Sequence, residues 1–86
     1  MKILADSRPQ KEQDLEGCIF NVSLNFSGRI SLCVGLRYMG GNPDNQRNYR
    51  FDHANIWRAG ISEPEEVSEE GTHALLRMAN ADTVLA

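Results

Sequence analysis

Residues 18–38 read CIFNVSLNFSGRISLCVGLRY and contain the clearest pattern in this 86-residue chain. In each half of the stretch, every second residue is large and apolar, and the residues between are mostly polar or small. A side-chain period of two is typical of an antiparallel strand that buries one face and exposes the other. The stretch therefore predicts a β-hairpin that turns near Gly28.

The register of this hairpin can be predicted from its two faces. Residues directly opposite each other share a face, so even-numbered residues must pair with even-numbered ones. A two-residue loop at Ser27-Gly28 breaks this rule, whereas a three-residue loop from Phe26 to Gly28 satisfies it by pairing Leu24 with Ile30. The longer loop also places Gly28 where a type I turn with a G1 bulge requires left-handed backbone.

The two cysteines indicate a reducing compartment. In the predicted register Cys18 faces inward and Cys33 faces outward, so we expect no disulfide between them. Neither cysteine belongs to a metal or redox motif, and the N-terminal apolar stretch is too short for a signal peptide. No run of residues approaches membrane-spanning length, and we therefore expect a cytoplasmic protein.

Two further segments complete a small sheet. Residues 47–53 alternate again, with Tyr49 and Phe51 on one face, and predict a third strand, which Ile56-Trp57 would either extend or end with a bend. A third strand is expected because an isolated hairpin is marginal in water. Residues 2–5 are suited to a short edge strand, which would be the fourth. The polar residues 6–17, which join this edge strand to the hairpin, predict an irregular connector.

The C-terminal third predicts a helix over residues 62–80. Ser62 can cap its N-terminus, and Glu65 stands at the reciprocal position of a capping box. Apolar residues recur every three or four positions along one stripe: Val67, Gly71, Ala74, Leu75, Met78 and Ala81. Gly71 weakens a helix by about 1 kcal/mol relative to alanine, so a shorter helix from Thr72 is the alternative.

These segments together predict one α+β domain. The core of the prediction is a three- or four-stranded antiparallel sheet built on the 18–38 hairpin, with one C-terminal helix on its apolar face. The apolar tail 83–86 is expected to dock on this body or to add a strand. The predicted organisation of residues 1–86 is an N-terminal segment and connector (1–16), a β meander (17–58) and the helix (62–80).

Charge is distributed unevenly along the chain, whose net charge is −3. The centre is basic, with Arg29, Arg37, Arg47, Arg50 and Arg58. The C-terminal third is acidic, with Glu63, Glu65, Glu66, Glu69, Glu70 and Asp82. Such asymmetry predicts two electrostatically different surfaces.

The sequence contains no motif that indicates catalysis or metal binding. Neighbouring residues on a strand point to opposite faces, so Asp52 is not expected to orient His53 as a general base. Cys18, Cys33 and the two histidines, His53 and His73, lack the short spacing of a structural zinc site. We therefore expect no enzyme activity, no cofactor and no metal.

The remaining class is a small non-catalytic protein-binding module. Tiny single domains of this kind are often inhibitors encoded by phages or mobile elements, and the specific hypothesis is an anti-CRISPR-like inhibitor. It would occlude a site on a larger protein or nucleoprotein complex, through the acidic helix or the arginine-rich strand. The candidate contacts are Arg47, Arg50, Trp57, Glu66, Glu69 and Glu70.

The alternative is a single-stranded nucleic-acid-binding module, because arginines between aromatic residues can track phosphates and stack on bases. Its candidate residues are Arg37, Arg47, Tyr49, Arg50 and Trp57. Alternation places Tyr49 on the face opposite Arg50, and the acidic C-terminal third lowers affinity for phosphates. A homodimer through an unpaired sheet edge is a further expectation.

Overall fold

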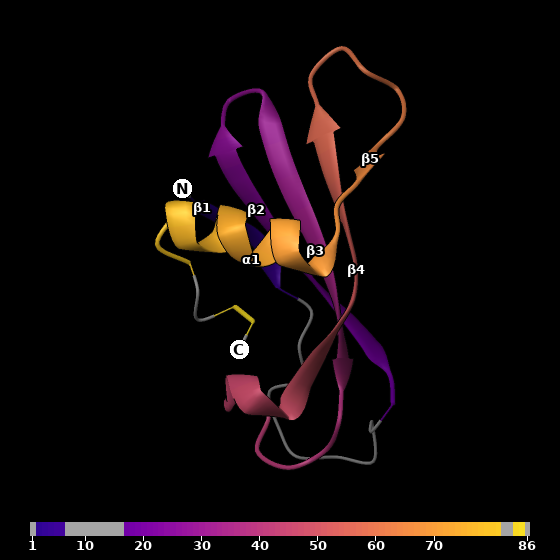
Figure 1. Cartoon of the computed structure of the whole chain (residues 1–86), viewed down its shortest axis with the longest axis vertical. Helices are drawn as coiled ribbons and strands as arrows, with labels where there is room; N and C mark the ends of the chain where they lie inside the picture. Colours follow the sequence, from indigo (N-terminus) through magenta and orange to yellow (C-terminus); the bar gives the residue numbers. More distant parts are fainter. Residues whose placement is uncertain (1, 7–16, 82–83, 86) are drawn as a thin grey trace.

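A computed structural model describes residues 2–6, 17–81 and 84–85. Within these residues, five antiparallel strands form one sheet, in which each strand lies beside the one that precedes it in the sequence (Figure 1). The strands are β1 (Lys2–Asp6), β2 (Ile19–Ser27), β3 (Ile30–Tyr38), β4 (Tyr49–Arg58) and β5 (Glu65–Glu66). A 3-10 helix, η1 (Gln46–Asn48), precedes β4, and the helix α1 (Glu69–Met78) follows β5.

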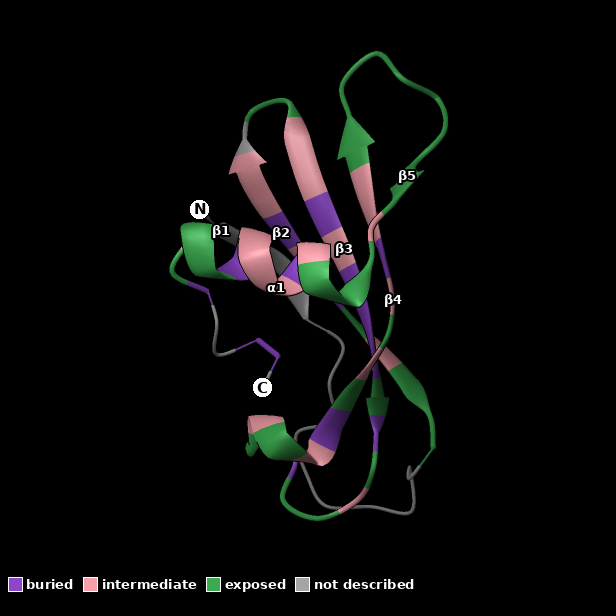
Figure 2. Cartoon of the chain, viewed as in Figure 1, coloured by how far each residue is buried: buried purple, intermediate pink, exposed green. Residues whose placement is uncertain are grey.

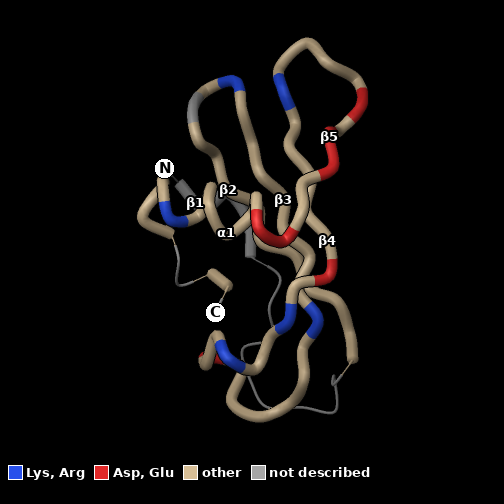
Figure 3. Tube along the Cα trace, viewed as in Figure 1, with Lys and Arg blue, Asp and Glu red and all other residues tan. Residues whose placement is uncertain are grey.

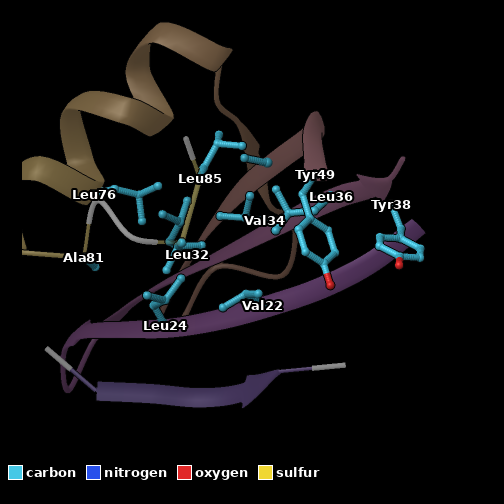
Figure 4. Packing of buried hydrophobic residues seen from close by; sticks show 12 residues of the cluster. Val22, Leu24, Leu32, Val34, Leu36, Tyr38, Tyr49, Leu76, Ala81 and Leu85 are labelled. Atoms are coloured by element: carbon cyan, nitrogen blue, oxygen red, sulfur yellow. The ribbon is translucent and has the colours of Figure 1, made fainter. Parts of the chain in front are cut away.

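The predicted α+β fold class is confirmed, including the fourth strand, β1, at the sheet edge. The fifth strand, β5, was not predicted. Helix α1 crosses one face of the sheet, and the cluster of buried hydrophobic residues lies between them (Figures 1 and 4). The connector expected at residues 6–17 falls mostly outside the described residues.

The core is built from the even-numbered residues of the hairpin, as their alternation predicts. They are Val22, Leu24, Leu32, Val34, Leu36 and Tyr38, each fully buried (Figure 2). Leu76 from α1 packs on this set, and the tail residues Val84 and Leu85 join it (Figure 4). Docking of the tail is thus confirmed for these two residues, while residues 83 and 86 lie outside the described part.

The hairpin register differs from the prediction by two residues. Leu24 pairs with Leu32, not with Ile30, although even-numbered residues still pair with even-numbered ones through most of the ladder. The parity rule was therefore correct, but several registers satisfy it. The rule did not anticipate an interruption of the ladder near the turn.

A β-bulge at Phe26 is that interruption. Ser27 pairs with Ile30, so the loop is the two residues Gly28 and Arg29. Neither of them has a positive φ, and the left-handed backbone predicted at Gly28 is wrong. Mirror-image hairpin turns need a positive φ at the first loop residue, so this turn is of another type. A bulge adds right-handed twist, and the bulge at Phe26 can supply the twist that such a turn lacks.

Two glycine substitutions, one in this turn and one in the loop between β3 and η1, test the observed backbone conformations. A Cβ at Gly28 would meet no atom within 4 Å, so Gly28→Ala should change the free energy of unfolding by less than about 0.5 kcal/mol. At Gly41, φ is +88° and a Cβ would lie 2.7 Å from Asn48 Nδ2. Gly41→Ala should therefore cost about 1–2 kcal/mol. Urea unfolding measures both, and equal costs would contradict the observed turn.

Strand β4 starts and ends later than the predicted segment 47–53. Arg47 belongs to η1, because the Asn45 side chain caps that turn by accepting a hydrogen bond from Arg47 N at 3.0 Å. From Tyr49 the chain is extended up to Arg58, which confirms the extension through Ile56-Trp57.

A second β-bulge, at Asp52, divides β4 into two halves. The register shifts between Gly35 and Leu36 of β3, and Phe51 pairs with Leu36 before the shift. Odd-numbered residues of β4 face the core before the bulge, and even-numbered ones do so after it, as the fully buried Ala54 shows. The bulge thus reverses the alternation within one strand.

Helix α1 begins at Glu69, so the start predicted at Ser62 is wrong. Ser68 is the N-cap, and its side chain accepts a hydrogen bond from Gly71 N at 3.0 Å. The preceding residues Glu65 and Glu66 pair with β4 instead of joining the helix. This pairing satisfies the backbone hydrogen-bonding groups of β4 at the sheet edge. The same groups would have no strand partner if residues 65–66 belonged to the helix. The helix continues through Gly71.

The buried face of α1 also differs from the predicted stripe. Thr72 and Leu76 are fully buried and Leu75 is half-buried, whereas Met78 is 80% exposed. The Thr72 hydroxyl donates to Ser68 O at 2.8 Å, so its burial leaves no unsatisfied donor. The periodicity of apolar residues therefore did not predict that Thr72, a polar residue, occupies a core position.

Candidate binding surfaces

The structure separates the predicted partner contacts into two groups. Glu66, Glu69, Glu70 and Trp57 lie along one side, where β4, β5 and the start of α1 meet. Arg47 and Arg50 lie at the other end of β4, next to η1. Figure 3 shows acidic positions at β5 and the start of α1, and basic ones lower on β4. The two groups therefore lie at opposite ends of β4.

The acidic edge is the set Glu63, Glu65, Glu66, Glu69 and Glu70, all exposed. Pairing of Glu65 and Glu66 with Ile56 and Asn55 of β4 holds the middle of this edge in place. Arg58 Nη2 lies 3.4 Å from Glu65 Oε2, with both side chains about half or more exposed. Such an exposed pair contributes little to stability. Arg58 offsets only one of the five carboxylates, so the edge remains negative.

Two large apolar side chains accompany the acidic edge. Trp57 is 45% exposed near the end of β4, and Ile61 is 58% exposed in the turn that follows. That turn is closed by a hydrogen bond from Ile61 N to Arg58 O at 3.1 Å. Ile61 was not predicted as a contact, although an isoleucine between Gly60 and Ser62 in a turn is an unusual choice. Exposed tryptophan beside other apolar surface is typical of interface anchors.

The residues of the nucleic-acid alternative do not gather into a stacking surface. Tyr49 is 1% exposed, and its hydroxyl donates to Pro43 O at 2.8 Å inside the core. Arg50 Nη1 donates to Arg47 O at 2.8 Å, which directs it along the chain. Trp57 lies at the opposite end of β4 from these residues. Among the residues that the structure describes, no aromatic platform therefore lies beside Arg47 and Arg50.

The bulge at Asp52 creates a cluster on the face of the sheet opposite α1. His53 Nδ1 lies 2.8 Å from Asp52 Oδ2, and Arg37 Nη2 donates to Asp52 Oδ1 at 3.2 Å. Asp52 was not expected to orient His53, because neighbours in a regular strand point apart. The bulge removes that restriction, and the expectation was wrong. We call Arg37, Asp52 and His53 the bulge cluster.

Gly35 provides the space for this cluster. It pairs with His53 across β3 and β4, and a Cβ at Gly35 would lie 2.2 Å from His53 Cε1 and 2.7 Å from Nε2. The Cε1 side of the imidazole therefore occupies the space over Gly35. Any side chain at Gly35 would displace the ring from its bond with Asp52.

The bulge cluster predicts a specific pH dependence of stability. The hydrogen bond from His53 lowers the pKa of Asp52 below its ordinary value of 3.8, with a contribution from Arg37. A lowered folded-state pKa stabilises the fold above pH 3.8, and this contribution disappears as pH falls through the lowered value. In urea unfolding, the part of the stability difference between wild type and Asp52→Asn that comes from the Asp52 carboxylate should shrink as pH falls below about 4. A constant difference down to pH 2 would contradict the cluster.

The cysteines differ from the prediction at one position. Cys18 precedes β2 and is exposed, so its predicted inward orientation is wrong. Cys33 is half-buried, and both thiols are free. Among the described residues, no three histidine, cysteine or acidic side chains gather closely enough to hold a metal ion.

No protein-family model, curated protein or solved structure matches this chain. None of the helices in the described ranges is long and apolar enough to cross a membrane. The function must therefore be argued from the surfaces themselves.

Proposed function

We propose that this chain is a small non-catalytic protein-binding module that docks its acidic edge on a basic surface of a larger protein or nucleoprotein complex. The observation that carries the proposal is the combination of five exposed glutamates with two exposed apolar side chains, Trp57 and Ile61. Exposed carboxylates by themselves would be explained by the solubility that they give to a protein. Apolar anchors within a charged rim are the usual composition of a specific interface.

The negative charge of the acidic edge indicates which kind of partner it would bind. A basic groove that holds nucleic acid attracts carboxylates by the same charges that attract phosphates. The module would therefore occlude such a groove and compete with its nucleic acid. In its most specific form, the proposal is an inhibitor from a phage or another mobile element, of the anti-CRISPR type.

The test is capture from bacterial lysate with the tagged chain as bait, with and without nuclease treatment, read by mass spectrometry. The proposal predicts that a defined protein or complex is retained after nuclease treatment. A matched bait, Trp57→Ala with Ile61→Ala, should lose that partner, because it keeps every charge but removes both anchors.

Two results would count against the proposal. Capture that disappears with nuclease would favour direct nucleic-acid binding through the arginines of β3 and β4. Equal capture by the wild-type and anchor-less baits would show that Trp57 and Ile61 are not contacts.

A further inference from the structure

Two arginines lie directly opposite each other at the end of the sheet that adjoins η1. Arg37 of β3 pairs with Arg50 of β4, so the two side chains share the face opposite α1, and both are exposed. Figure 3 shows basic positions close together at this end of β3 and β4. Opposed residues have Cβ atoms about 5 Å apart, and like charges at such positions destabilise a sheet. An anion held between the two guanidinium groups would remove this repulsion.

Backbone carbonyls, and not carboxylates, hold the Arg50 side chain in place. Its Nη1 donates to Arg47 O at 2.8 Å and to Tyr49 O at 3.2 Å. Neutral carbonyls fix the guanidinium without cancelling its charge. Within the described ranges, Arg50 belongs to no ion pair, and its Nε and Nη2 donate no hydrogen bond. Arg50 is thus an oriented cation whose Nε–Nη2 edge is left for a ligand.

The Arg37 side chain is oriented as well. Its Nη1 donates to Gly17 O at 2.8 Å, and its Nη2 donates to Asp52 Oδ1 at 3.2 Å. Asp52 offsets one positive charge, but Arg47 adds another exposed cation in the turn before β4. The other acidic residue of this end, Asp44, is exposed and forms no ion pair with the three arginines in the described part of the chain. Positive charge is therefore in excess here.

We propose that Arg37 and Arg50 form a binding site for a single phosphate group carried by a small molecule. Guanidinium groups bind phosphate through charge-assisted and often bidentate hydrogen bonds. Two of them on opposed residues can contact different oxygens of one phosphate, and Arg47 strengthens the field around it. The site lies at the opposite end of β4 from the acidic edge, so it does not depend on the proposed protein partner.

Two features favour a small phosphate compound over a nucleic acid. A nucleic acid needs a series of cations along its backbone, whereas this chain has a net charge of −3. Single strands also need exposed aromatic side chains for base stacking, and Tyr49, the aromatic residue next to Arg50, is 1% exposed. One phosphate group needs only the opposed arginines.

Titration of the isotope-labelled chain with inorganic phosphate, at constant ionic strength and followed by NMR, tests the site. The proposal predicts saturable shifts centred on the amides of Arg37 and Arg50. Arg50→Gln should weaken phosphate binding about tenfold or more, because a hydrogen bond to a charged group contributes at least that much. The matched control is Arg77→Gln, which removes an exposed arginine of α1 and should leave the affinity unchanged.

Two further probes identify the source of the phosphate. Ribose 5-phosphate should bind at least as tightly as inorganic phosphate and compete with it. A short oligonucleotide without a terminal phosphate should bind no more tightly than inorganic phosphate. If this oligonucleotide bound more tightly, and its affinity increased with length, the site would serve a nucleic-acid backbone and the proposal would be wrong.

Other outcomes would also overturn the proposal. Shifts that never saturate, or an equal loss of affinity in Arg77→Gln and Arg50→Gln, would indicate general screening of charge. A purely structural role for Arg50 predicts that Arg50→Gln lowers the Tm in phosphate-free buffer and leaves phosphate binding intact. If Arg50→Gln does not fold, Arg50→Lys decides, because it keeps the charge but loses the bidentate edge and should still bind phosphate more weakly than wild type.

Discussion

Leu76→Ala should lower the free energy of unfolding by about 3 kcal/mol, within the range of 2–5 kcal/mol for leucine truncation in a core. Leu76 is fully buried and is the main apolar contact of α1 with the sheet. For a domain of this size, the loss corresponds to a decrease in Tm of roughly 10–20 °C. Thermal unfolding followed by circular dichroism measures it directly.

The matched control is on the same helix. Met78→Ala should change the Tm by less than about 3 °C, because a residue that is 80% exposed loses almost no buried contact. Leu75→Ala, at a half-buried position, should lie between the two. The sequence periodicity predicts a different order, with Leu75 and Met78 as core residues. A larger cost at Met78 than at Leu76 would therefore contradict the observed orientation of α1.

The parts of the fold that could be predicted depend on regular alternation. The even-numbered residues of β2 and β3 form the core, as their period of two indicates. The pairing of the two strands is regular from Phe20 with Leu36 up to the bulge at Phe26. The prediction failed where regularity ends. Bulges at Phe26 and Asp52 each insert one residue, and alternation cannot show an insertion that changes which face is buried.

The helix start was wrong for a different reason. Ser62 and Glu65 satisfy the local capping pattern, but Ser68 and its neighbours satisfy one as well. Which serine caps the helix depends on whether residues 65–66 pair with β4, and that contact is between distant parts of the chain. Local signals alone cannot decide such a competition.

The candidate sites likewise include features that the sequence could predict and features that it could not. Exposed glutamates could be predicted from charge alone, and their gathering beside Trp57 results from the pairing of β5 with β4. The bulge cluster could not be predicted, because adjacent residues on a regular strand never meet. Only the bulge at Asp52 and the space above Gly35 bring the carboxylate and the imidazole together.

Reversal of three glutamates should abolish partner binding while the fold survives. The variant is Glu66→Lys with Glu69→Lys and Glu70→Lys, and all three side chains are exposed. Each reversal adds two positive charges, so the net charge changes from −3 to +3. Placing like charges against a basic partner should weaken binding at least about 100-fold, because like-charge juxtaposition at an interface costs several kcal/mol. Binding to the captured partner, measured by calorimetry, gives the change.

Stability must be separated from binding in this variant, since lysines in the first turn of α1 oppose the helix dipole. That effect should cost about 0.3–1 kcal/mol at each of Glu69 and Glu70, too little to unfold the domain. The opposite reversal, Arg47→Glu with Arg50→Glu, is the control: it should preserve binding, because those side chains lie at the other end of β4. If the arginine variant lost the partner and the glutamate variant retained it, the acidic edge would be excluded and the basic end of β4 would be the contact. Loss in the glutamate variant alone, with a folded domain, leaves the acidic edge as the surface that the partner recognises.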